Sequence, residues 1–89
     1  MRKYEITARF DASGQEVGCG FIEAETALNA ITILLTEKFD DLAFANEVTA
    51  YSPDDLSATV YLDEDSYEIH VYDNSGNDVI VIKTKLEDR

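Results

Sequence analysis

A chain of 89 residues with 45% hydrophobic residues is long enough for one folded domain and too apolar for intrinsic disorder. Its formal net charge of −12 argues against direct binding to nucleic acid or to an anionic membrane, because both depend on lysine and arginine. No apolar run approaches the roughly 20 residues that a membrane-spanning helix needs, and the single cysteine, Cys19, suits a reducing compartment. We therefore expect one acidic domain over residues 1–89, located in the cytoplasm.

The N-terminal segment has the pattern of a β-hairpin. Residues 3–10 alternate between apolar and polar side chains, as a half-buried strand does. A turn follows, and a second alternating run at Val17, Cys19 and Phe21 returns antiparallel to the first, whereas Ile22 and Ala24 are the better core residues beyond it. Continuing the register of this run would bury Glu23, so we expect a β-bulge near Gly18 or Gly20 that turns Glu23 outward.

The middle of the chain predicts one amphipathic helix. Thr26 is a suitable N-cap for a helix over residues 27–38. Residues 40–46 fit either a last helical turn or a packed loop, and residues 47–51 are predicted as a short strand. The apolar face of the helix is expected to consist of Leu28, Ile31, Leu35 and Phe39, widened by Ala27 and Leu34.

The last third predicts a three-stranded antiparallel meander. Alternating runs at residues 57–62, 67–72 and 79–85 are separated by short polar turns. A register that pairs Leu62 with Tyr67 and Tyr72 with Val79 creates one apolar face that should lie under the helix. This face contains Ala58, Val60, Leu62, Tyr67, Ile69, Val71, Ile80 and Ile82. The order β-β-α-β-β-β-β predicts an α+β fold, a two-layer sandwich in which one amphipathic helix covers one face of a mostly antiparallel sheet.

The opposite face of this sheet carries Tyr61, Tyr72, Val79 and Val81 among polar neighbours, and one helix cannot cover both faces. Exposed aromatic and apolar patches often mark association surfaces, so this face is a candidate homodimer or partner surface. The alternative is a strongly curled sheet that closes on itself and buries these residues.

The residue inventory argues against an enzyme. The only histidine, His70, falls within a strand beside Thr59, but a hydroxyl next to a histidine is too common to indicate catalysis, and Cys19 lies in a different hairpin. One cysteine and one histidine cannot fill a tetrahedral zinc site. The acidic turns at residues 63–65 and 73–78 offer oxygen ligands but do not match a calcium-binding loop. We expect no catalytic, metal or cofactor site, with cation binding at these turns as the open alternative.

The charge pattern is the main indication of function. Between Lys38 and Lys83 the chain has eleven carboxylates and neither lysine nor arginine. A charge run is usually a solvated face, but carboxylates spaced along turns and strands can also stand in for phosphates and occupy a nucleic-acid channel. In size and charge the chain resembles the small acidic proteins with which phages and mobile elements inhibit restriction and CRISPR enzymes.

The sequence thus predicts a non-enzymatic binding protein that engages a basic surface of a partner protein, in particular as a nucleic-acid-mimicking inhibitor of a nucleic-acid-binding enzyme. Tyrosines would anchor the contact, and carboxylates would steer it. The candidate partner-binding residues are Asp40, Asp41, Glu47, Asp54, Asp55, Tyr61, Asp63, Glu64, Asp65, Glu68, Tyr72, Asp73 and Asp78. The alternative is a structural or accessory domain that oligomerises through its open sheet face, with acidity serving only solubility.

Overall fold

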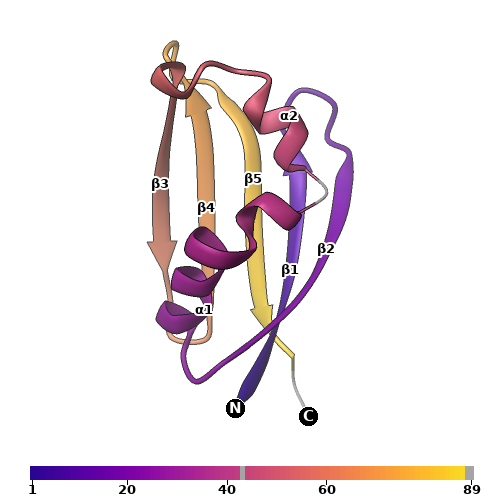
Figure 1. Cartoon of the computed structure of the whole chain (residues 1–89), viewed down its shortest axis with the longest axis vertical. Coiled ribbons are helices and arrows are strands. Elements are labelled where there is room, and N and C mark those ends of the chain that lie inside the picture. Colours follow the sequence, from indigo (N-terminus) through magenta and orange to yellow (C-terminus); the bar gives the residue numbers. More distant parts are fainter. Residues whose placement is uncertain (43, 88–89) are drawn as a thin grey trace.

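The computed structural model describes residues 1–42 and 44–87. An antiparallel sheet of five strands is covered on one face by a helix and the helical turns that continue it, so the predicted α+β fold class is confirmed (Figure 1). The strands are β1 (Arg2–Phe10), β2 (Glu16–Ala24), β3 (Leu56–Leu62), β4 (Ser66–Asp73) and β5 (Asp78–Leu86). The helices are α1 (Ala27–Ile33), a π-helical turn (Leu34–Lys38), a 3₁₀ turn (Phe39–Asp41), α2 (Ala45–Thr49) and a second 3₁₀ turn (Pro53–Asp55).

The C-terminal strand β5 lies in the middle of the sheet. The strand order is β2-β1-β5-β4-β3, and every neighbouring pair is antiparallel. The sequence of β5 explains its position, because residues 79–82 are four consecutive apolar residues and a strand of that kind favours burial on both faces. Ile80 and Ile82 are fully buried on the helix side, and Val81 is only 2% exposed on the other face.

The hairpin of β1 and β2 contains the predicted bulge. The pairing register shifts between Ile6, which faces Gly20, and Thr7, which faces Gly18, so Cys19 is the extra residue. Gly20 has a φ of +116°, a conformation that glycine adopts without the steric cost that a side chain brings. The shift returns Ile22 and Ala24 to the buried face and leaves Glu23 exposed, as expected.

Helix α1 begins at the predicted N-cap, because the Thr26 hydroxyl accepts a hydrogen bond of 3.1 Å from the Asn29 N–H. The predicted buried face is partly wrong. The buried residues of this helix and of the turn that follows it are Ala27, Ala30, Ile31 and Leu34. Leu28 and Leu35 are 58% and 48% exposed, because each lies one residue, about 100° of helical rotation, beyond this stripe.

The segment between the helix and the meander differs from the prediction. The helical path continues through Asp41, and Ala43 lies outside the described residues. The strand expected at residues 47–51 is wrong, because this segment forms α2. The buried residues of α2 and its N-cap are Phe44, Ala45 and Val48, and their spacing is that of a helix rather than the alternation of a strand.

The meander pairs largely as predicted, with Leu62 opposite Tyr67. Tyr72 faces Asp78 and not Val79, because a bulge shifts the register of β4 and β5 after Val71. The apolar face of β4 and β5 is buried under the helix as expected.

The β3 part of that predicted face is not covered by the helix. Val60 and Leu62 are 41% and 51% exposed, and Ala58 is exposed as well. A helix about 10 Å wide cannot cover five strands spaced about 4.8 Å apart, and α1 packs against β2 and β4. The edge strand is therefore left partly uncovered.

Candidate functional site

The predicted acidic residues separate into groups along the molecule, which measures 39 × 21 × 20 Å. β3 separates two of these groups, because Asp55 precedes it and Asp63 follows it (Figure 1). The Asn74 side-chain amide donates a 2.8 Å hydrogen bond to Asp55, so the 3₁₀ turn before β3 meets the turn between β4 and β5. The groups comprise Asp54, Asp55, Asp73 and Asp78 at one end of the sheet, Asp63, Glu64 and Asp65 at the other, and Asp40 and Asp41 on the helix side.

Several of these carboxylates have partners within the protein. Asp73 Oδ1 accepts the backbone N–H groups of Ser75 and Asn77 at 2.9 and 3.1 Å. Asp65 forms an ion pair of 2.8 Å with Arg2. Such bonds to the backbone and to arginine shape the turns, so these acids have a structural role whether or not a partner binds.

Four of the predicted partner-binding carboxylates are exposed and have neither a side-chain hydrogen bond nor an ion pair within the described part of the chain. They are Asp40, Asp41, Asp54 and Glu64. Glu47 belongs to α2, but its side chain lies outside the described residues. The four exposed acids are distributed over the helix side and both ends of the sheet, so they do not form one contiguous patch.

His70 lies between two carboxylates on the face that the helix does not cover. Its Nε2 forms a hydrogen bond with Glu68, and its Nδ1 lies 3.2 Å from Asp78 Oδ2. The hydrogen bond to Glu68 is the largest cause that raises the pKa of His70, partial burial opposes it, and Asp78 adds to it. Both ring nitrogens therefore lie next to hydrogen-bond acceptors. This arrangement favours the protonated imidazolium, which would then have a structural role. Sequence reasoning placed Glu68 and Asp78 in a partner surface and missed this cluster.

We expect the stability contributed by His70 to depend on pH. A folded-state pKa above the ordinary value of 6.5 gives a contribution that is fully present below 6.5 and is lost as the pH rises through the folded pKa. The free energy of unfolding lost in His70→Gln should therefore be larger at about pH 6 than at about pH 9. Urea unfolding of both proteins at the two pH values measures this difference. An equal loss at both pH values would mean that Glu68 and Asp78 do not stabilise the protonated form of His70.

The two predicted tyrosine anchors differ in exposure. Tyr61 is 61% exposed and contacts the His70 ring edge-on, at a centroid distance of 5.4 Å. Tyr72 is half-buried, and its hydroxyl accepts a 3.4 Å hydrogen bond from Thr59. Because Val81 is buried on this face, the exposed apolar patch is smaller than expected and centres on Tyr61.

The positive charges gather on this open sheet face. Four of the six lysines and arginines in residues 1–42 and 44–87 lie there, where they alternate with acids of neighbouring strands: Lys3, Arg9, Lys83 and Lys85. Of the other two, Arg2 is paired with Asp65, and Lys38 ends the π-helical turn. The helix side and the ends of the sheet are thus rich in carboxylates, whereas the open face has mixed charge.

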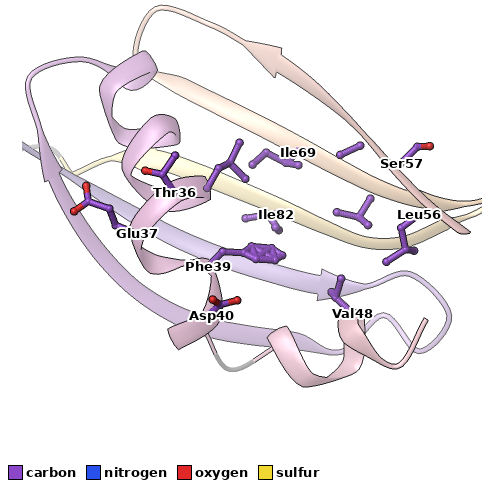
Figure 2. Close-up of a pocket in the computed structure, with 12 residues that line it drawn as sticks. Thr36, Glu37, Phe39, Asp40, Val48, Leu56, Ser57, Ile69 and Ile82 are labelled. Atoms are coloured by element: carbon purple, nitrogen blue, oxygen red, sulfur yellow. The ribbon is translucent and has the colours of Figure 1, made fainter. Parts of the chain in front are cut away.

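An apolar groove lies between the helical turns and β3, and the sequence did not predict it. It has a volume of about 360 Å³, with a floor of sheet residues that includes Ile69 and Ile82 (Figure 2). Phe39 and Val48 close one part of it, and the carboxylate of Asp40 lies among its lining residues. The groove arises because the helix leaves the β3 side uncovered, which no local sequence pattern reveals.

No arrangement for metal or redox chemistry is evident in the described residues. They hold no group of three or more histidine, cysteine, aspartate or glutamate side chains placed to bind a metal ion. Burial raises the pKa of the half-buried Cys19 thiol, which lowers its reactivity. None of the helices in residues 1–42 and 44–87 has the length and apolar character needed to cross a membrane.

Comparisons of the chain with family models, with curated proteins and with solved structures found no match.

Proposed function

We propose that this chain is a non-enzymatic acidic binding protein that engages a basic surface of a partner protein. The proposed target is a nucleic-acid-binding enzyme, which the chain inhibits in the cytoplasm as phage and mobile-element inhibitors do. The observation that carries this proposal is the segregation of charge. The net charge is −12, and four of the six lysines and arginines in the described residues lie on the open face, so carboxylates dominate the helix side and both ends of the sheet.

Shape and charge together support nucleic-acid mimicry. The molecule is elongated, at 39 × 21 × 20 Å, and carries exposed carboxylates at both ends and along the helix side, as a short duplex carries phosphates along its length. A basic channel that binds phosphates by electrostatic attraction would attract such a surface in the same way. The mixed-charge open face would then point away from the basic partner.

Capture from a bacterial lysate at low and then high salt tests this proposal. We expect a nucleic-acid-binding protein to be retained at about 0.1 M salt and released at about 1 M, because screening weakens contacts between exposed charges. Added DNA should displace the same protein. Recovery of no partner, or of one whose binding does not respond to salt or DNA, would contradict the proposal.

Charge-neutralised variants then locate the surface. A variant in which the four exposed acids are replaced (Asp40→Asn, Asp41→Asn, Asp54→Asn and Glu64→Gln) should lose affinity for the captured protein by about tenfold or more. The matched control changes the net charge equally, at Glu5→Gln, Glu16→Gln, Glu23→Gln and Glu25→Gln, and should lose much less. Equal losses would mean that only net charge matters and that no acidic surface is recognised.

Oligomerisation through the open sheet face is the second candidate function. The observation in its favour is the mixed charge of that face, which would let two copies meet without the repulsion expected between their acidic sides. Tyr61 would be the aromatic anchor of such a contact. A stable oligomer whose mass in analytical ultracentrifugation is insensitive to salt, and which Tyr61→Ser dissociates, would favour this function over partner inhibition.

A further inference from the structure

β3 offers an unpaired backbone edge. It pairs only with β4, so its other edge faces no strand within the described residues. The Asp63 N–H donates to the Ser66 carbonyl at 2.8 Å, which makes these two residues a hydrogen-bonded pair of the ladder. Bonded and non-bonded pairs alternate along an antiparallel ladder. The β3 residues whose N–H and C=O groups point outward, away from β4, are therefore Leu56, Ala58, Val60 and Leu62.

The two edges of the sheet differ in how well they resist pairing. β2, at the far edge, contains the bulge at Cys19 and the charged residues Glu16 and Glu23, all of which discourage the addition of a strand. β3 has no charge, no proline and no bulge over its seven residues, Leu56–Leu62. An edge of this kind is a template for an added strand.

A second copy of this chain is a poor occupant of that edge. Asp54 and Asp55 immediately precede β3, and Asp63 and Glu64 immediately follow it. Antiparallel pairing of two β3 strands would set the acids before one strand against the acids after the other. Parallel pairing would place each acidic flank of one copy beside the same flank of the other copy. Both arrangements place like charges together, whereas a strand with basic flanks would find opposite charges at both ends.

We propose that β3 accepts an extended segment of a basic partner protein as a sixth strand, with a short uncharged stretch along Leu56–Leu62 and lysine or arginine at both ends. This inference rests on the proposed function and specifies how the partner is held. Main-chain hydrogen bonds to the outward groups of β3 provide the affinity, and the acidic flanks fix the position of the segment. On the helix side, its apolar side chains lie beside the exposed Val60 and Leu62 and beside Ala58, which lines the groove.

A synthetic peptide tests the strand addition directly. The probe has seven alternating valine and threonine residues between two lysine pairs, and amide hydrogen exchange is followed by NMR. In the free protein the Val60 and Leu62 amides should exchange faster than those of Thr59 and Tyr61, which bond to β4. Saturating peptide should slow exchange at Val60 and Leu62 by about tenfold or more and leave Thr59 and Tyr61 nearly unchanged.

N-methylated peptides separate strand addition from simple charge attraction. Two versions carry N-methyl groups on alternate core residues, one set at odd and one at even positions. One set should bind at least about tenfold more weakly, because it removes the donors that face β3, and the other should bind nearly as well as the parent. Equal binding of both sets would overturn strand addition and leave attraction to a basic partner intact. Equal binding of a peptide with glutamate flanks would overturn the role of the acidic ends.

A protein variant provides an independent check. Val60→Pro removes one outward N–H while sparing the bonds to β4, and it should weaken peptide binding by about fivefold or more. Val60→Thr keeps the N–H and should bind as the unsubstituted protein does. If Val60→Pro does not fold, the methylated peptides decide the matter. Failure of every peptide to bind also overturns the inference, while capture of a salt-sensitive partner from the lysate would still support the proposed function.

Discussion

Replacement of Phe44 with alanine is expected to lower the free energy of unfolding by about 3–5 kcal/mol. The Phe44 side chain is 0% exposed and belongs to the main hydrophobic core. Its ring meets that of Phe39 edge-on, at a centroid distance of 5.5 Å. It lies at the start of α2, so its loss would leave a cavity between the sheet and the connection that closes the groove. Urea unfolding followed by circular dichroism measures the change.

Phe21→Ala is the matched control, since it makes the same chemical change at a residue that is 54% exposed. Its ring lies 4.8 Å from the Lys3 ammonium, a contact worth about 0.5–1 kcal/mol at an exposed site, so the loss should stay near that value. If Phe44→Ala were as mild as Phe21→Ala, then α2 would not be anchored by this ring. The wall of the groove formed by Val48 would then be less fixed than the packing indicates.

The elements that the sequence predicted correctly are those that local patterns determine. Strict alternation identified β1 and the meander, and a threonine before an apolar run identified the start of α1. The bulge in β2 was predictable because the alternating register would otherwise have buried Glu23. In each case the pattern and the structure involve residues within a few positions of one another in the chain.

Most of the errors and omissions depend on contacts between distant segments. The segment 47–51 is short, and its pattern alone did not distinguish a strand from a helix. The burial of both Phe44 and Val48 identifies it as part of helix α2. The stripe of α1 that is buried depends on how the helix lies across the sheet. The exposure of Val60 and Leu62 depends on both the strand order and the width of the helix.

The candidate site was predictable in composition and not in arrangement. The acidic residues and the two tyrosines could be named from the sequence, but the strand order was needed to bring Arg2 of β1 to Asp65 in the turn between β3 and β4. Asp78 reaches His70 across the sheet from β5, whereas Glu68 lies two residues from His70 on β4, where the alternation of a strand already places both on one face. The groove and the unpaired edge of β3 likewise depend on the strand order and on how the helix lies across the sheet.

Alanine at Gly20 is expected to cost about 1–3 kcal/mol of unfolding free energy, because residues other than glycine are strained at a φ of +116°. Gly18 is the matched control. A Cβ atom at either position would meet no heavy atom within 4 Å, so the two variants differ in backbone conformation and not in crowding. At Gly18, where φ is not positive, alanine should be neutral or stabilise by up to about 1 kcal/mol, since it restricts the unfolded chain. Thermal unfolding of both variants measures the difference. Similar midpoints would mean that β2 relaxes its bulge at little cost, and β2 would then lose the irregularity that distinguishes its edge from that of β3.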